Sequence, residues 1–194
     1  MYSITAIEPI INAVGSNDHE LLNAVASRFK LEFAKQFGGE PDDEQSSEFR
    51  RYAESLITGD PPPDAEPGAW NYVITALAAH FDLQLHQLPL NDWKHYYVWE
   101  DYIPLVAEYI SPEITALLNF LCMGRPLRGR TLSADGCVFA WLTPAEVTTL
   151  HDALTEVEPS AEMEEFHLDD FHDELLDCLE ITKKRNACLY LTAH

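Results

Sequence analysis

A short apolar run that leads directly into a helix-capping sequence limits most strongly what this chain can fold into. The run Cys137–Leu142 is apolar and β-prone, so it predicts a buried strand. Thr143 and Glu146 then have the spacing of a capping box, with Pro144 at the first helical position. A strand followed at once by an amphipathic helix indicates a small sheet covered by helices.

Amphipathic helices are predicted along most of the rest of the chain. Asn17 and Glu20 have the spacing of a second capping box, and apolar residues then recur at helical spacing up to the Gly38-Gly39 pair. A further helix is expected to start near Ser46 or Ser47. The predicted helices cover about 18–37, 46–58, 69–82, 111–123 and 143–157, followed by a helical region from Ser160.

Two further segments predict strands, one near each end of the chain. Tyr2–Ile7 and Ala187–Leu191 are short and β-prone, which allows the two ends to pair. From Leu83 to Tyr109 the patterns are mixed, and we expect short helical turns there. The fold class is therefore α+β, a mainly helical single domain over residues 1–194. It has a small sheet of about three short strands and a Pro-rich loop at 59–68.

The composition excludes several classes of protein. The chain has 33 Asp and Glu against 12 Lys and Arg, a formal net charge of −21, so its surface repels nucleic-acid phosphates and anionic membranes. No stretch approaches the roughly 20 apolar residues of a membrane span, and Met1–Glu8 lacks a signal-peptide pattern. The four cysteines are irregularly spaced and are predicted to be reduced. We therefore expect a cytoplasmic protein that binds neither nucleic acid nor membrane.

The acidic residues are concentrated in one part of the sequence. Between Arg130 and Lys183 there is no Lys or Arg. Like charges one helical turn apart destabilise a helix slightly. The region is therefore either a docking face for a basic protein or a solvated face that keeps the protein soluble. At helical spacing its stripe consists of Glu162, Glu165, Asp169, Asp173 and Asp177.

A second candidate site combines an aromatic run with an arginine loop. Trp93, Tyr96 and Trp99 belong to a stretch of five aromatic rings in ten residues. Such rings stack on a sugar or base, anchor an interface, or pack a loop onto helices. Arg128 and Arg130 follow a predicted helix end and either bind an anionic ligand or pair with acidic residues of the same chain. Together these residues predict an alternative pocket.

No metal, cofactor or catalytic residue is predicted. His167 and His172 would lie about 140° apart around a helix, and Asp169 with His172 supplies only two ligands. Cys178 lies among acidic residues, which should raise the pKa of its thiol and make it unreactive. The sequence contains no phosphate-binding loop, dinucleotide motif or nucleophile elbow. A non-catalytic role is therefore favoured over an enzyme.

Several motifs occur in an order that carries a resemblance. They are an N-terminal strand, Gly15–Leu22, a central Trp/Tyr helix, Leu142–Val147, and a basic segment before a final strand. In this order the chain resembles an uncharacterised family of bacterial cytosolic proteins, a domain of unknown function, and is distantly similar to the YfbM-like proteins of unknown function. The resemblance implies an α+β fold and a bacterial origin, and it assigns no catalytic residue.

The leading hypothesis is a non-catalytic protein-binding module. It would use the acidic stripe to bind a basic protein, as an inhibitor or immunity-type protein does. The alternative is an enzyme or small-ligand binder whose pocket is formed by the aromatic run 93–102 and the arginine loop 125–130.

Overall fold

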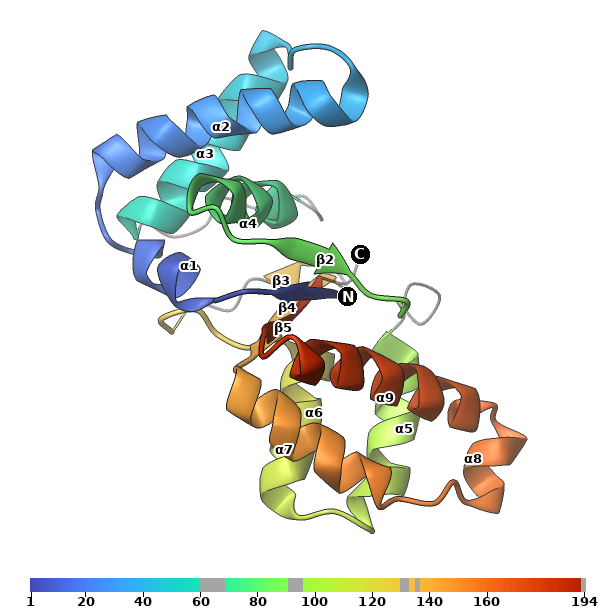
Figure 1. The fold of residues 1–194 in the computed structure, drawn as a ribbon. Coiled ribbons are helices and arrows are strands. Elements are labelled where there is room, and N and C mark those ends of the chain that lie inside the picture. The colour runs from blue at the N-terminus through green and yellow to red at the C-terminus, as the bar shows by residue number, and fades with distance from the viewer. Residues whose placement is uncertain (60–68, 91–95, 130–132, 135–136, 193–194) are drawn as a thin grey trace. The chain divides into compact units, whose positions relative to one another are not determined.

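The computed structural model describes residues 1–59, 69–90, 96–129, 133–134 and 137–192 (Figure 1). The chain divides into two compact units. Unit 1 comprises Met1–Ala6, Leu85–Pro126 and Thr131–His194, and unit 2 comprises Ile7–Gln84 and Leu127–Arg130. The prediction of a single domain is not tested by this division and stays a prediction.

Unit 1 contains an antiparallel sheet in the order β2-β1-β5-β4-β3. The N-terminal and C-terminal strands pair at its centre, with Ile4 opposite Cys188, as the sequence allows. The three predicted strands are all present, and the sheet has two short strands beyond them. The strands are β1 (Tyr2–Ile4), β2 (Leu85–Gln87), β3 (Ser133–Ala134), β4 (Cys137–Leu142) and β5 (Cys188–Thr192).

Side chains of β5 alternate between the two faces of the sheet. Leu189 and Leu191 belong to the hydrophobic core of unit 1. Tyr190 lies between them and stacks with Tyr2 and Phe139, at ring-centroid distances of 5.7 and 5.1 Å. This is the period-2 pattern expected of a strand that is buried on both faces.

The helices of unit 1 gather on one side of its sheet (Figure 1). Helices α6, α7 and α9 contact β4 or β5. The predicted capping box is confirmed at the start of α7, where Thr143 and Glu146 satisfy each other's backbone amides. Ser111 caps α6, and Gly124 ends it. The helices are α5 (Tyr96–Ala107), α6 (Pro112–Met123), α7 (Pro144–Thr155), α8 (Ala161–Glu165) and α9 (Leu168–Lys184).

Unit 2 is helical in its described residues. Helix α2 ends at Gly38, as predicted, because the left-handed backbone there (φ 75°) suits glycine. The capping box predicted at Asn17 is wrong, because Asp18 is the N-cap and Asn17 itself is left-handed. Helix α3 also begins earlier than Ser46, because Asp42 forms a capping box with Gln45. The helices are α1 (Glu8–Ala13), α2 (His19–Phe37), α3 (Asp43–Thr58) and α4 (Ala69–His80).

The mixed region 83–109 differs from the prediction. It contains a strand, β2, and a twelve-residue helix, α5, in place of short helical turns. β2 pairs with β1 in register Tyr2 to Gln87, a contact with a distant segment that no local pattern contains. Of the predicted Pro-rich loop, residues 60–68 lie outside the described part of the chain.

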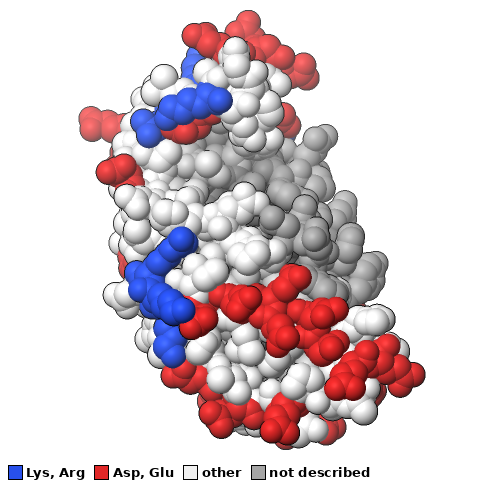
Figure 2. Space-filling view, turned by 45° about the vertical axis from the view of Figure 1, so that its right-hand side comes forward, with Lys and Arg blue, Asp and Glu red and all other residues white. Residues whose placement is uncertain are grey.

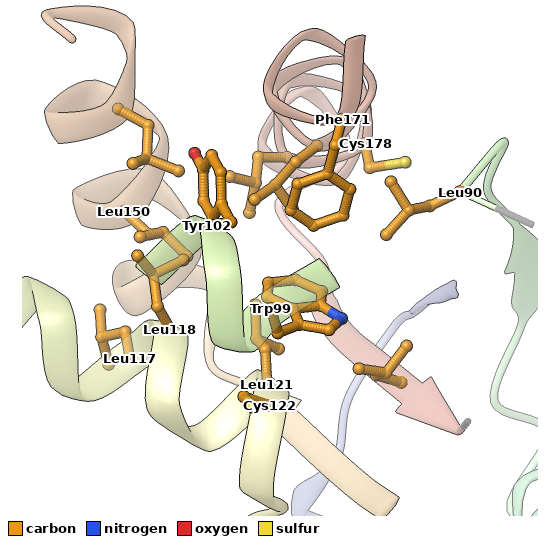
Figure 3. Packing of buried hydrophobic residues seen from close by; sticks show 14 of the residues in the cluster. Leu90, Trp99, Tyr102, Leu117, Leu118, Leu121, Cys122, Leu150, Phe171 and Cys178 are labelled. Carbon is orange, nitrogen blue, oxygen red and sulfur yellow. The ribbon is translucent and has the colours of Figure 1, made fainter. Parts of the chain in front are cut away.

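Aromatic side chains from α5 and α9 form the centre of the core of unit 1. Trp99 and Tyr102 extend from α5 toward Phe171 on α9 (Figure 3). Both rings meet Phe171 edge-on, each at 4.9 Å between centroids. Edge-to-face pairs of this kind add roughly 0.5–1.5 kcal/mol to the free energy of burial.

Candidate functional site

The predicted acidic stripe lies on two helices rather than one. Helix α8 ends at Phe166, and His167 has a left-handed backbone (φ 56°) before α9 begins. Glu162 and Glu165 therefore belong to α8, and the remaining members belong to α9. We call these five residues the acidic face: Glu162, Glu165, Asp169, Asp173 and Asp177.

Helix α9 has two distinct sides. One side is buried against the rest of unit 1, and Phe171, Leu175 and Leu179 on it are completely buried. On the other side Asp173 and Asp177, one turn apart, are exposed. Asp169 on α9 is half-buried, and both members on α8 are exposed. Burial of the apolar side therefore fixes which carboxylates face the solvent.

Three described basic residues of unit 1 form ion pairs, and their partners are carboxylates outside the acidic face. Arg125 pairs with Glu146, at 2.7 Å between Nη1 and Oε2. Lys183 pairs with Asp152, and Lys184 pairs with Glu180 at 2.7 Å. Within the part of the chain that the structure describes, none of the five carboxylates of the acidic face has an ion-pair partner. Their negative charge is therefore uncompensated there.

An exposed aromatic residue lies between the two helices that carry the acidic face. Phe166 is at the junction of α8 and α9 and is 61% exposed. It follows Glu165, and the next residue, His167, adopts a left-handed backbone that costs a non-glycine residue of order 1 kcal/mol. The chain thus exposes one large apolar residue between the acidic residues of α8 and those of α9.

Figure 2 shows how charge is distributed on this side of the molecule. Asp and Glu side chains spread over the surface that α8 and α9 form in Figure 1, and a separate group of Lys and Arg lies at the edge. The separation agrees with the sequence, in which no Lys or Arg occurs between Arg130 and Lys183.

The structure describes the surroundings of two side chains of the alternative pocket, those of Trp99 and Arg128. Trp99 is a core residue, only 3% exposed, and its ring packs against Phe171. Arg128 donates a hydrogen bond to the carbonyl oxygen of Val14 within unit 2, at 3.1 Å. Trp93 and Arg130 lie outside the described residues, and Tyr96 lies in the first turn of α5. The pocket therefore stays a prediction.

Arg125, in the predicted arginine loop, has a structural role. Its guanidinium makes two hydrogen bonds to Glu146, at 2.7 and 2.9 Å, and lies 3.8 Å from the centroid of the Trp141 ring. Burial opposes ionisation of Glu146, but the hydrogen bonds from Arg125 and Thr143 outweigh it and hold the pKa of that carboxyl below its ordinary value. Arg125 therefore pairs with an acidic residue of the same chain, and the ligand binding or pairing predicted for Arg128 and Arg130 stays a prediction.

A buried polar pair was missed by sequence reasoning. Tyr102 Oη lies 2.6 Å from Nδ1 of His172, and both side chains are almost fully buried. Burial lowers the pKa of His172, although Asp173 and a backbone hydrogen bond with Leu154 act in the opposite direction. Burial also raises the pKa of Tyr102. The two residues are 70 positions apart in the chain, so no local pattern predicts their contact.

Burial determines the chemical environment of Cys178 and His172. The pKa of Cys178 is raised to about 11, chiefly by burial, with Glu174 and Asp177 contributing in the same direction. The raised pKa is therefore confirmed, and burial is its main cause. Nδ1 of His172 already contacts Tyr102. Among the described residues no group of three or more His, Cys, Asp or Glu side chains is arranged to hold a metal ion.

Comparisons with known proteins complete the description of the site. In the described part of the chain no helix is long and apolar enough to cross a membrane. No curated protein and no solved structure matches the chain. Residues 1–192 match a family whose description is domain of unknown function (DUF7691). The chain therefore belongs to this family, which is the kind of uncharacterised family that its sequence motifs predict.

Proposed function

We propose that this protein is a non-catalytic binding module that docks a basic protein on the acidic face, as an inhibitor or immunity-type protein would. A cytoplasmic location, a bacterial origin and a distant relation to YfbM-like proteins belong to the same proposal. The observation that carries it is the row of carboxylates on α8 and α9 that has no ion-pair partner among the described residues.

The cost of the row to helix stability supports this proposal. Asp169, Asp173 and Asp177 follow one another at intervals of one turn on α9. Each such like-charge pair destabilises a helix by roughly 0.2–0.5 kcal/mol. The helix N-terminus favours negative charge, which offsets part of this destabilisation for Asp169. Asp173 and Asp177 lie beyond the first turn. A binding role explains why α9 carries these carboxylates despite their cost to helix stability.

Phe166 supports a protein partner over a small cation. Interfaces are anchored by a few apolar or aromatic side chains surrounded by polar ones. Phe166 is 61% exposed and lies in the chain between the acidic residues of α8 and those of α9, which supports such an arrangement. Opposite charges around such an anchor accelerate association and select against acidic proteins.

The experiment compares two variants of equal net charge. In the site variant, Glu165→Gln, Asp173→Asn and Asp177→Asn remove three charges from the acidic face. In the control variant, Glu40→Gln, Glu44→Gln and Glu54→Gln remove three exposed charges from unit 2. Each protein is used as bait in a lysate of the source cells at low and moderate salt, with chemical crosslinking and mass spectrometry.

The proposal expects a basic protein that crosslinks to α8 or α9. Wild type and the control variant should retain it, and the site variant should lose it. Moderate salt should weaken the complex, because screening shortens the reach of the charges. Equal recovery by the site and control variants, or crosslinks confined to unit 2, would overturn the proposal.

A further inference from the structure

A pocket in unit 2 lies between the end of α1, the start of α2 and the end of α4. Its volume is about 530 Å³, within the range of sites that hold small molecules. All of its lining residues belong to unit 2, and none of them is a residue of the acidic face. The residues that matter to its chemistry are Asp18, Glu20, His80, Phe81, Leu21 and Ala24.

The wall at the start of α2 is held in place by the end of α3. The amides of Gly15 and Asn17 donate to the carbonyl oxygens of Leu56 and Ile57, at 2.9 and 2.8 Å. Carbonyls in the last turn of a helix have no partner within the helix, so the 15–17 turn caps α3. Both donors have positive φ, which glycine and asparagine tolerate best. The turn that carries the pocket wall is therefore fixed before any ligand binds.

The charge of the pocket wall selects against anions. A helix N-terminus commonly binds anions through its free amides. Here Oδ1 of Asp18 already accepts the amides of Glu20 and Leu21, at 3.0 and 2.9 Å. Asp18 and Glu20 both line the pocket. The second oxygen of Asp18 and the carboxylate of Glu20 make no hydrogen bond within the described residues. None of the lining residues is Lys or Arg.

The apolar part of the lining, which lies beside the polar Asn12, Ser16 and His80, favours a ligand with an apolar stem. Leu21, Ala24 and Phe81 are half-buried and line the pocket together with Ala13, which is buried. The ring of Phe81 meets that of His80 edge-on, at 5.0 Å between centroids. Aromatic faces attract cations and also pack against methylene groups. The pocket thus offers carboxylates at one wall and apolar surface beside them.

We propose that this pocket binds an organic amine: a protonated ammonium group on an apolar stem. The ammonium group contacts Asp18 and Glu20, and the stem packs against Phe81 and Leu21. The same chemistry is present in a free alkylamine and in a lysine side chain. The pocket is independent of the function proposed for the acidic face, because the two belong to different units.

Isothermal titration and NMR chemical-shift mapping test the proposal with the full chain. The probes are hexylamine, hexanol, hexanoate and N-acetyl-lysine methylamide. Hexylamine should shift resonances of the pocket residues and bind at least about tenfold more tightly than hexanol or hexanoate, because a charge-assisted hydrogen bond is worth that much. Tighter binding of the lysine derivative than of hexylamine would identify a lysine side chain as the natural occupant.

Matched variants separate the pocket from general attraction to an acidic protein. Asp18→Asn with Glu20→Gln removes two charges, and asparagine still caps α2. Glu44→Gln with Glu54→Gln removes two exposed charges from α3, outside the pocket, and serves as the control. The pocket variant should weaken hexylamine binding about tenfold and the control should leave it unchanged. Equal weakening by both variants, or hexanoate binding as tight as that of hexylamine, would overturn the proposal.

Filling the pocket provides an independent check. Ala24 lies on α2 and lines the pocket, so Ala24→Phe should occupy part of its volume. Hexylamine binding should be lost while circular dichroism shows an unchanged helix content. Retained binding by a folded Ala24→Phe protein would place the amine elsewhere and sink the proposal.

Discussion

Tyr102 Oη and His172 Nδ1, 2.6 Å apart, form a hydrogen bond between α5 and α9 inside the core of unit 1. Burial lowers the pKa of His172 and favours its neutral ring, and the tautomer of that ring sets which of the two groups donates. The bond therefore satisfies two polar groups that would otherwise be buried without a partner.

Removing the hydroxyl should destabilise the protein. Tyr102→Phe keeps the ring and its contact with Phe171 but leaves Nδ1 of His172 without its hydrogen-bond partner. A buried polar atom without a partner costs about 1–3 kcal/mol. Urea unfolding should show this loss, whereas Tyr109→Phe, at a site 60% exposed, should change the free energy of unfolding by less than about 0.5 kcal/mol. Equal stability of the two variants would contradict the role of the bond.

Stability should depend on pH through His172. Its pKa in the folded protein lies below the ordinary value of 6.5, so below that value the unfolded chain binds more protons than the folded one. The contribution of the neutral ring is thus complete above pH 6.5 and is lost as the pH falls toward the folded-state pKa. Melting temperatures measured from pH 7.5 to 5 should fall more steeply for wild type than for His172→Gln. Parallel curves would argue against this assignment.

Arg125 should not be replaceable by lysine. Lysine keeps the charge but loses the two-point contact with Glu146 and the stacking on Trp141. Arg125→Lys should lower the free energy of unfolding by about 1–3 kcal/mol. Arg51→Lys is the matched control, because Arg51 is exposed and its contacts with Glu48 and the Tyr52 hydroxyl are long, at 4.0 and 3.3 Å. Similar urea midpoints for the two variants would show that Arg125 contributes charge alone.

The cap of α2 predicts a difference between two substitutions at one position. Asp18→Ala removes the acceptor of the Glu20 and Leu21 amides and should cost about 1 kcal/mol. Asp18→Asn keeps an acceptor and should lower the free energy of unfolding by only a few tenths of a kcal/mol. Thermal unfolding of both variants measures the difference, and a loss as large for asparagine as for alanine would mean that the charge, not the hydrogen bonds, stabilises α2.

The acidic face should reduce the stability of the free protein. Asp173→Asn with Asp177→Asn relieves repulsion along α9 and should raise the free energy of unfolding by a few tenths of a kcal/mol at low salt. The gain should disappear in high salt, because screening removes the repulsion in wild type as well. A loss of stability at low salt would show that the two carboxylates have partners that stabilise the fold.

Helix ends were predicted correctly where only one residue in a turn of the sequence could act as the cap. Thr143 and Glu146 form the expected capping box, and Gly38 ends α2. Where adjacent residues compete for one role, the sequence did not decide. Asp18 caps α2 in place of Asn17, because Asn17 takes the left-handed conformation that lets its amide reach Ile57.

The sequence by itself determined the α+β class, the presence of a strand near each end of the chain and the location of the acidic residues, because periodicity, caps and charge are local properties. Tertiary structure decided the rest. The break at His167 divides the acidic stripe between α8 and α9, and Trp99 became a core residue because Phe171 packs against it. The Tyr102–His172 bond and the pocket beside Asp18 join segments far apart in the chain, and their geometry exists only after the helices have packed.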